Sequence, residues 1–282
     1  MNCKNKFISL FTVAFVCILS VSFKPLMDGG SGQTKVMILT DMGVIKIRLY
    51  NETPLHRDNF LKLVKDHYYD SLLFHRVIQN FMIQGGDPDS KRALPDKTLG
   101  DGGPPYTIPA EFNPKLFHKK GALAAARESD LDNPSQASSG SQFYIVQGKV
   151  FTDSLLKVQA KRITKMKLFN QIINRPENKT LLEQYTRYAK AAIPDSLKYI
   201  NDIINKQLDT ELPGVAPYAF SEEQTKTYTT TGGTPHLDGS YTVFGEVYEG
   251  FEVIDDIAKQ DVERKTSRPK KDIRIISVSI IQ

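Results

Sequence analysis

The sequence predicts a mainly β domain that is interrupted by a block of helices, and three patterns support this prediction. Short runs of alternating apolar and polar residues, typical of strands with one buried face, recur between residues 34 and 152. Apolar residues at helical spacing then begin at Asp153. Strand-like runs return after Gly239. We therefore expect one β domain in two pieces, 34–152 and 232–282, around an α-helical insertion over 153–231.

The composition is that of a globular chain. The 282 residues are 40% hydrophobic and 24% charged, and the formal net charge is +5. This length allows one domain with a sizeable insertion and a proper core. The charge is too weak to argue for nucleic acid as a partner, and no arginine-rich tail or nucleic-acid motif adds to it. We expect no nucleic-acid partner.

Residues 1–22 differ in kind from the rest and resemble a secretory signal peptide. Two lysines precede an apolar run from Phe7 to Phe23, and small serines lie near a possible cleavage point. The segment predicts export, into the periplasm if the source is bacterial. Two alternatives stay open: an uncleaved signal that anchors the chain in the membrane through residues 7–23, and a lipid anchor at Cys17, whose neighbours fit the lipoprotein pattern poorly.

Cysteine and histidine usage argues against disulfides and metal sites. Both cysteines, Cys3 and Cys17, lie in the signal-like segment, so a mature chain beginning near Phe23 needs no disulfide. The glycine-rich stretch 23–33 is then a flexible lead-in. The five histidines are not paired at zinc-ligand spacing, and no nucleotide-binding loop precedes a helix. We expect neither a metal nor a cofactor.

The first β piece begins with a hairpin and a helix. Residues 44–50 alternate isoleucine and leucine with lysine and arginine, after a turn at 41–43. Thr53 before Pro54 is a helix-start signal, and apolar residues then recur at helical spacing up to Asp66. We expect Thr53 to cap this helix and the helix to cover one end of the β domain.

The stretch 74–87, FHRVIQNFMIQGGD, predicts two short strands around a Gln-Asn turn. Strict alternation places Arg76 on the same face as Phe74 and Ile78, beside apolar side chains. Its guanidinium keeps its charge at any working pH. Two interpretations stay open: an arginine that lays its stem on apolar surface with its head in water, and a functional group.

Further short strands follow in this piece. In one of them, alternation puts Gln142 and Tyr144 on one face and Phe143 and Ile145 on the other. The second face belongs to the core, and the first is a candidate groove wall. The additional strands are predicted over residues 106–111, 122–127 and 142–147.

The insertion is predicted to contain three amphipathic helices. They are expected over 153–174, over 179–192 and from Asp195, as a cap after Pro194, to about Leu208. The first has a basic face, without an acid between Ser154 and Pro176. The insertion is either an appendage packed on the β domain or a module for a partner, such as anionic lipid or acidic protein.

The last piece completes the β domain. Ile273 and Ile275, then Val278 and Ile280, indicate a buried closing strand. The first and last strands are both apolar on one face, so we expect them to pair and to remove an exposed edge. The predicted elements are a strand over 242–248, a helix over 251–258 and a closing strand over 272–282.

The run FHRVIQNFMIQGGD resembles the signature of the cyclophilins, the barrel-shaped peptidyl-prolyl cis-trans isomerases. The resemblance continues in the family's order through GALAAAR at 121–127, GSQFYI at 140–145 and LDGSYTVFGEV at 237–247. It implies a closed antiparallel eight-stranded β-barrel with two capping helices. It also implies catalysis of rotation about Xaa-Pro bonds.

The resemblance further implies roles for ten residues. Arg76 matches the donor to the prolyl nitrogen of the twisted amide, and Gln84 matches the residue that fixes the guanidinium and the substrate backbone. The implied proline pocket consists of Phe81, Met82, Tyr144 and Leu237. The implied rim consists of Gln142, Arg127, His236 and Tyr241. Alternation does not put the adjacent Phe81 and Met82 on one wall, so the pocket requires a local twist.

Four of these positions depart from the residues usual in the family. They are Arg127, Tyr144, His236 and Tyr241. All four retain polar or aromatic character, so activity is expected to persist, while the peptide preference stays open. Because of His236, we expect weak cyclosporin binding.

The implied substrates are proline-containing segments of unfolded or exported proteins, and we expect a monomer. The alternative is a non-catalytic cyclophilin-like chaperone or assembly factor that holds peptides and uses the insertion for selective contact. The intact set of Arg76, Phe81, Met82 and Gln84 favours catalysis, because a pure binder does not need it.

Overall fold

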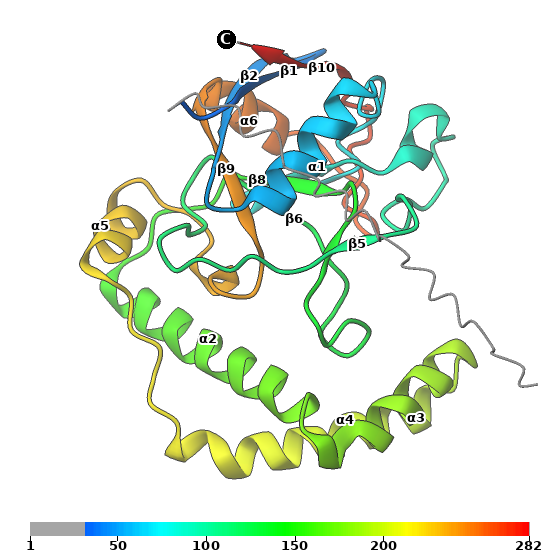
Figure 1. The fold of residues 1–282 in the computed structure, drawn as a ribbon, viewed down its shortest axis with the longest axis vertical. Coiled ribbons are helices and arrows are strands. Elements are labelled where there is room, and N and C mark those ends of the chain that lie inside the picture. Colours follow the sequence, from blue (N-terminus) through cyan, green and yellow to red (C-terminus); the bar gives the residue numbers. More distant parts are fainter. Residues whose placement is uncertain (1–31, 282) are drawn as a thin grey trace, which may run out of the picture. The chain divides into compact units, whose positions relative to one another are not determined.

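The computed structural model describes residues 32–281, and Figure 1 shows their arrangement. The predicted signal peptide and most of the predicted lead-in lie outside the described residues. The β domain carries α1 and α6, while α2, α3 and α4 form a group below the sheet in this view and α5 lies beside the β domain. Within residues 32–281, no helix combines the length and apolar character that crossing a bilayer requires.

Ten strands and six α-helices form the described part of the chain. The strands are β1 (Lys35–Thr40), β2 (Gly43–Leu49), β3 (Arg76–Ile78), β4 (Met82–Gly85), β5 (Thr107–Ile108), β6 (Ala122–Ala125), β7 (Ser138–Ser139), β8 (Phe143–Val146), β9 (Val243–Glu249) and β10 (Ile275–Ile281). The helices are α1 (Pro54–Lys65), α2 (Asp153–Ile173), α3 (Lys179–Lys190), α4 (Pro194–Glu211), α5 (Glu222–Thr230) and α6 (Phe251–Ala258). Short 3₁₀ turns are η1 (Pro88–Arg92), η2 (Pro176–Asn178), η3 (Leu212–Gly214) and η4 (Pro235–Leu237).

Eight strands form one antiparallel sheet in the order β10-β1-β2-β9-β6-β8-β4-β3. β1 pairs with both β2 and β10, which confirms the predicted hairpin and the predicted pairing of the first and last strands. The sheet is nevertheless open, because its end strands β10 and β3 form no ladder with each other. The fold is a half-barrel, and the predicted closed barrel is wrong.

The gap between the end strands has a local cause. β3 has only three residues, and Ser71, shortly before it, has a positive φ of 68°, which bends the chain away from strand geometry. A single bridge between Leu73 and Arg274 forms there. The backbone N–H groups of Ser71 and Phe74 also donate to the carbonyls of Ile275 and Ile273, at 2.8 and 2.9 Å. Loop hydrogen bonds therefore replace a strand ladder.

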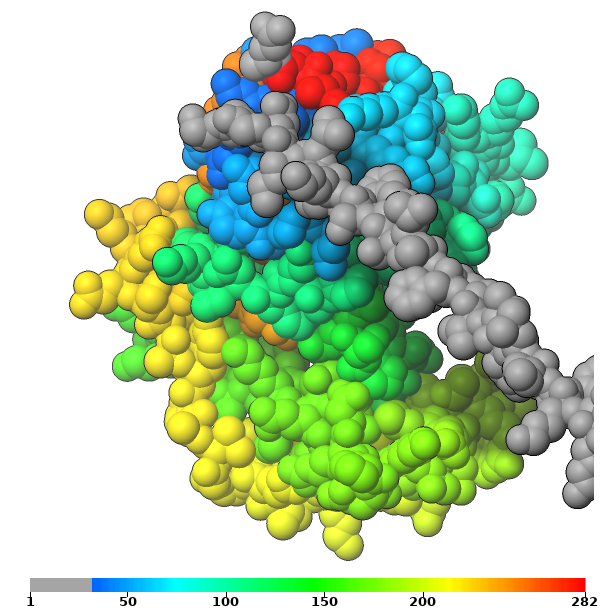
Figure 2. Space-filling view, in the orientation of Figure 1, coloured from blue at the N-terminus to red at the C-terminus, as the bar shows by residue number. Residues whose placement is uncertain are grey.

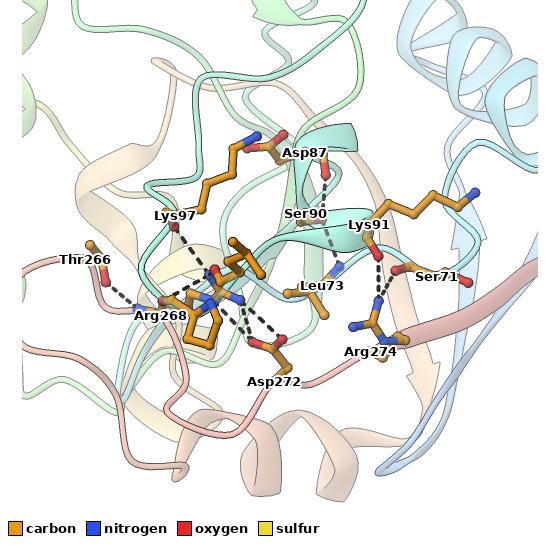
Figure 3. Close-up of polar contacts among 12 residues, drawn as sticks. Ser71, Leu73, Asp87, Ser90, Lys91, Lys97, Thr266, Arg268, Asp272 and Arg274 are labelled. Carbon is orange, nitrogen blue, oxygen red and sulfur yellow. Dashed lines mark hydrogen bonds and ion pairs between the residues drawn. The ribbon is translucent and has the colours of Figure 1, made fainter.

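Two arginines that precede β10 in the sequence hold the loops next to the gap between β3 and β10, as Figure 3 shows. Arg274 donates to the carbonyls of Ser71 and Lys91. Arg268 is buried, donates to three carbonyls of loop 94–97, and pairs with Asp272 at 2.9 Å. These contacts give loop carbonyls next to the gap a hydrogen-bond partner.

The two faces of the sheet carry different clusters of apolar side chains. The main core lies between the sheet and the two helices α1 and α6, which contribute residues such as Phe60 and Ile254. This confirms two helices that cover the core of the β domain. A smaller cluster forms on the other face of β4, β6 and β8, with Met82, Tyr144 and Leu237 among its members.

Several boundaries differ from the sequence prediction. α1 begins at Pro54 as predicted, but the Thr53 hydroxyl makes no capping hydrogen bond. Glu111 replaces it, since its carboxylate accepts from the backbone N–H groups of Leu55 and His56 at 3.1 and 3.0 Å. The predicted strand over 106–111 is reduced to β5, because Glu111 is used in this cap.

Two predictions at chain turns and ends are also corrected. Asp195 is an acid in the first turn of α4, where Ile193 holds the cap position, because Pro194 already occupies the first helical position. Ile280 is 41% exposed rather than buried. β10 lies at an edge of the sheet, so its second face and its end meet water.

The insertion contains the three predicted helices and one that was not predicted. α2, α3 and α4 pack around their own apolar cluster, which Leu131 of the β domain joins. The additional helix is α5, whose start is a capping box formed by Ser221 and Gln224. Figures 1 and 2 show α5 against the β domain and α4 farther from it.

We expect Arg268→Ala to lower the free energy of unfolding by about 2–4 kcal/mol, since it removes a buried side chain that is the common donor to three loop carbonyls and a partly buried carboxylate. Urea denaturation measures this change. Arg264→Ala is the matched control, because Arg264 lies in the same loop but is exposed, and its effect should stay within about 0.5 kcal/mol. Equal stability losses in the two variants would contradict the fastening role of Arg268.

Candidate active site

The β3–β4 hairpin forms as predicted, with a turn over residues 79–81. Asn80 has a positive φ of 62°, which asparagine tolerates, and its N–H donates to the side chain of Gln147 at 2.6 Å. Arg76 lies opposite Gln84, and Gln84 lies opposite Tyr144 on β8. Three strands thus bring these three side chains to one face of the sheet.

A cavity of about 570 Å³ opens over this face. Nine of the ten predicted site residues line it: Arg76, Phe81, Met82, Gln84, Arg127, Gln142, Tyr144, Leu237 and Tyr241. His236 is outside this lining, but its ring stacks on Phe81 with 5.5 Å between the ring centroids. The structure therefore brings the predicted residues together around one cavity.

A chain of side-chain hydrogen bonds fixes Arg76. Its Nη1 donates to Gln84 Oε1 at 3.1 Å, and Gln84 Nε2 donates to Gln142 Oε1 at 3.0 Å. Gln142 Nε2 then donates to the carbonyls of Gly100 and Gly102 at 2.6 and 2.8 Å. Gln84 holds the guanidinium as predicted. Gln142, predicted as a rim contact, is 6% exposed and supports Gln84.

The guanidinium of Arg76 is only partly solvated. Burial lowers the pKa of Arg76 from its ordinary value, although an arginine stays charged at working pH. Within residues 32–281, no carboxylate forms an ion pair with it. A desolvated cation without a counter-charge costs stability. This arrangement makes Arg76 a candidate for a functional group.

Apolar side chains form the adjoining wall of the cavity. Met82, Tyr144 and Leu237 are buried at 1%, 4% and 7% exposure, and Phe81 packs against them. Phe81 is the last residue of the turn, and β4 begins at Met82. Alternation therefore does not apply between the two, and both line the cavity. The local change in backbone direction that a pocket shared by Phe81 and Met82 requires is therefore present between the turn and β4.

A family model described as cyclophilin type peptidyl-prolyl cis-trans isomerase/CLD matches residues 35–186 and 195–280. The chain belongs to the cyclophilin-type peptidyl-prolyl cis-trans isomerase family. By this membership it is an isomerase, as the sequence predicted.

Similar proteins support this membership. A provisionally named peptidyl-prolyl cis-trans isomerase of Staphylococcus saprophyticus subsp. saprophyticus is 28% identical over 251 residues, which cover 89% of this chain and 93% of that protein. Its namesake in Staphylococcus aureus strain COL is 29% identical over 250 residues, with 88% and 92% covered. A crystal structure of a cyclophilin type isomerase of Cryptosporidium parvum has a TM-score of 0.52 at 21% identity. It covers 89% of this chain and 99% of that chain, which supports the cyclophilin fold.

One detail of the cyclophilin signature differs from the prediction. Phe74 does not share a face with Arg76, because Phe74 lies in the main core together with Val77. β3 starts only at Arg76, so the alternation does not extend back to Phe74. Ile78 does lie on the outer face with Arg76, next to the smaller cluster.

Arg127 is held more firmly than a rim residue requires. It pairs with Asp130 at 2.7 Å, donates to the carbonyl of Ser240 at 2.8 Å, and lies 4.4 Å above the ring of Tyr241. It anchors the start of loop 127–137. The insertion holds the same loop, since α2 donates from two asparagine side chains to the carbonyl of Pro134.

A glycine loop that was not predicted from the sequence completes the cavity. Asp87 is fully buried and accepts from the backbone N–H groups of Asp89 and Gly100 at 2.8 and 2.6 Å. A Cβ on Gly102 would lie 2.1 Å from Asp87 Oδ1, so this position requires glycine. Asp87 thereby presents the carbonyls to which Gln142 donates. The available signal in the sequence was an acid directly after two glycines, followed by Asp-Gly-Gly at 101–103.

Two more missed residues are His118 and Asp238, which lie behind Tyr144. His118 Nε2 is 3.0 Å from the Tyr144 hydroxyl, and its Nδ1 is 2.9 Å from Asp238. Burial raises the pKa of Tyr144 well above its usual range, so the phenol stays neutral. Among residues 32–281, no group of three or more metal-ligating side chains forms.

Because of the buried His75, we expect the free energy of unfolding to depend on pH. Burial lowers its pKa to about 4, and neither ring nitrogen has a hydrogen-bond partner within the described residues. The unfolded chain takes up this proton near pH 6.5 and the folded chain only near pH 4, so stability is full above pH 6.5 and falls as the pH drops. The loss should reach about 3 kcal/mol at pH 4.

Urea denaturation of the wild type and of His75→Gln between pH 7 and pH 4 tests this prediction. The variant should lose less stability over the same range, whatever its stability at pH 7. Identical slopes against pH would show that His75 does not contribute.

Proposed function

We propose that this isomerase accelerates rotation about Xaa-Pro bonds in exported client proteins, and so assists their folding, with Arg76 as the group that stabilises the twisted amide. Amide resonance sets a rotation barrier of about 18–20 kcal/mol, and uncatalysed exchange takes tens to hundreds of seconds. A catalyst must bind the twisted amide more tightly than either planar isomer. Reaching the millisecond range requires roughly 7 kcal/mol of such selective binding.

The chemistry requires neither a nucleophile nor a metal. As the C–N bond twists, the prolyl nitrogen becomes pyramidal and its lone pair becomes available as an acceptor. A fixed donor aimed at this nitrogen favours the twisted state over both planar states. Gln84 uses one donor of the Arg76 guanidinium, and the remaining N–H groups are available to the nitrogen and the substrate backbone.

The observation that carries the proposal is the half-buried guanidinium beside an apolar wall. Met82, Tyr144 and Leu237 offer the surface that a proline ring needs, and Arg76 lines the same cavity. Partial desolvation strengthens a hydrogen bond from this cation. Gln84 fixes its orientation before the substrate binds, so little reorganisation is needed.

The location and the clients form the second part of the proposal. The signal-like segment 1–22 supports export to the periplasm, with a retained signal or a lipid anchor as alternatives. The partners are then unfolded segments of exported proteins with Xaa-Pro bonds, and the isomerase acts on them as a monomer.

A peptide-holding chaperone or assembly factor is the second candidate function. The observation in its favour is the set of exposed apolar side chains on the insertion, where Leu155, Val158 and Tyr199 are 44%, 57% and 65% exposed. A client could bind to these side chains while its Xaa-Pro bond is isomerised in the cavity of the β domain. Catalysis explains why Gln84 fixes a half-buried Arg76 beside the apolar wall, an arrangement that a protein that only holds peptides does not need.

We expect Arg76→Ala to lower kcat/KM by about 10²–10³-fold, the usual cost of removing one transition-state donor. Exchange NMR on an Ala-Pro-Phe peptide, with purified residues 24–282, measures the rate without a coupled protease. The kcat/KM of Arg76→Lys should lie between those of the wild type and Arg76→Ala, because an ammonium keeps the charge but lacks the planar arrangement of donors of a guanidinium. Arg264→Ala is the control and should retain the wild-type rate.

The same experiment separates the two candidate functions. A wild type that binds the peptide without speeding its exchange would be a holding protein, and the insertion would then be the place to look for function. An Arg76→Ala variant that is folded and fully active would refute the role of Arg76 while leaving the isomerase activity intact.

Export has its own test. We expect expression of the full chain in a bacterium with two membranes to give a periplasmic product whose N-terminus, by sequencing, lies near Phe23. A product that keeps residues 1–22 and fractionates with membranes would support the retained anchor. A full-length product in the cytoplasm would contradict export.

A further inference from the structure

A buried chain of hydrogen bonds links the insertion to the wall of the cavity. The hydroxyl of Tyr228 in α5 donates to Asp238 Oδ2 at 2.7 Å. Asp238 Oδ1 accepts from both the backbone N–H and the ring Nδ1 of His118, each at 2.9 Å. His118 Nε2 is 3.0 Å from the hydroxyl of Tyr144. Each of the four residues is at most 4% exposed.

The donors and acceptors of this chain set one another. Because the carboxylate accepts at Nδ1, that nitrogen carries the proton, and Nε2 is left to accept from the phenol of Tyr144. Burial raises the pKa of both phenols well above their usual range, which keeps them donors. The ring planes of His118 and Tyr144 are nearly parallel, with an angle of 12° between them. The chain therefore fixes the plane of the Tyr144 ring.

The position of Tyr228 is as firmly determined as that of the residues it contacts. Its ring packs edge-on against Phe117 and Phe220, with centroids 5.5 and 5.7 Å away. The backbone passes close to it at Gly233, where a Cβ would lie 2.6 Å from the Tyr228 ring and 2.2 Å from the carbonyl of His118. The sequence around α5 is thus adapted to bring this phenol against the β domain.

From this geometry we infer that Tyr228 is a positioning residue for the isomerase: through Asp238 and His118 it fixes the Tyr144 ring and so shapes the wall that receives the proline. The inference rests on the proposed function, which assigns that wall to the substrate's proline. It gives α5 a part in substrate binding, although α5 contributes no residue to the lining of the cavity.

Tyr228→Phe tests the inference, because it removes one hydroxyl and keeps the ring. Asp238 retains two donors from His118, so the variant should fold. We expect kcat/KM on the Ala-Pro-Phe peptide to fall about three- to tenfold, the range for one buried hydrogen bond. The loss should appear mainly in KM, because Arg76 and Gln84 are untouched. Tyr218→Phe is the matched control and should keep the wild-type kcat/KM, since Tyr218 lies in the same aromatic group and its hydroxyl contacts Gln224.

A double-mutant cycle with Tyr144→Phe separates positioning from a general structural effect. If Tyr228 acts through the hydroxyl of Tyr144, adding Tyr228→Phe to Tyr144→Phe should change kcat/KM by less than about twofold. Urea denaturation, measured in parallel, should show a stability loss for Tyr228→Phe in both backgrounds. An unchanged kcat/KM for Tyr228→Phe, or an equal loss in both backgrounds, would overturn the inference.

The design distinguishes failure of the inference from failure of the proposed function. If the wild type does not accelerate exchange, the proposed function fails. The inference is then tested by peptide affinity, measured by NMR titration. Tyr228→Phe should weaken binding in the wild-type background and change it little in the Tyr144→Phe background. If the wild type accelerates exchange and Tyr228→Phe matches it in both rate and affinity, the inference fails and the function stands.

Discussion

The register of β3, β4 and β8 is the constraint on which the rest of the site depends. It sets Arg76 opposite Gln84 and Gln84 opposite Tyr144. The same register therefore determines which side chains of the sheet line the cavity and which pack in the main core. A shift by one residue would move Arg76 into the main core and Val77 out of it. The buried residues that stabilise the half-barrel therefore also hold the guanidinium over the cavity.

Two chains of hydrogen-bonded side chains, one partly buried and one buried, then fix the site residues that the register brings together. One runs from Arg76 through Gln84 and Gln142 to the glycine loop, and the other runs from Tyr144 through His118 to Asp238. Hydrogen-bonded side chains in such surroundings have few alternative orientations, and losing one partner leaves the next group unsatisfied. Both sides of the cavity are thus preorganised, the charged side and the apolar side alike.

The sequence predicted the parts of this structure that local patterns encode. Period-two alternation found the outward face of β8, and helical spacing found α2 to α4. Family resemblance selected ten residues that are far apart in the sequence, and nine of them line one cavity. The rest depends on contacts between distant segments. Glu111 caps α1 from more than fifty residues away, and the gap between β3 and β10 depends on the bend at Ser71. α5 was missed because its buried side chains, Gln224 and Tyr228, give no apolar stripe.

The contacts that tie the helical insertion to the half-barrel include hydrogen bonds from both of its ends. α2 holds loop 127–137 through the carbonyl of Pro134, and α5 reaches the pocket wall through Tyr228. An appendage that merely tethers a client needs neither contact. Removing residues 153–231 would take away one of the partners of Asp238 and expose Leu131, so a loss of activity in such a deletion would not separate holding from catalysis. Single hydroxyl removals are the better probe, because they leave the packing of both parts in place.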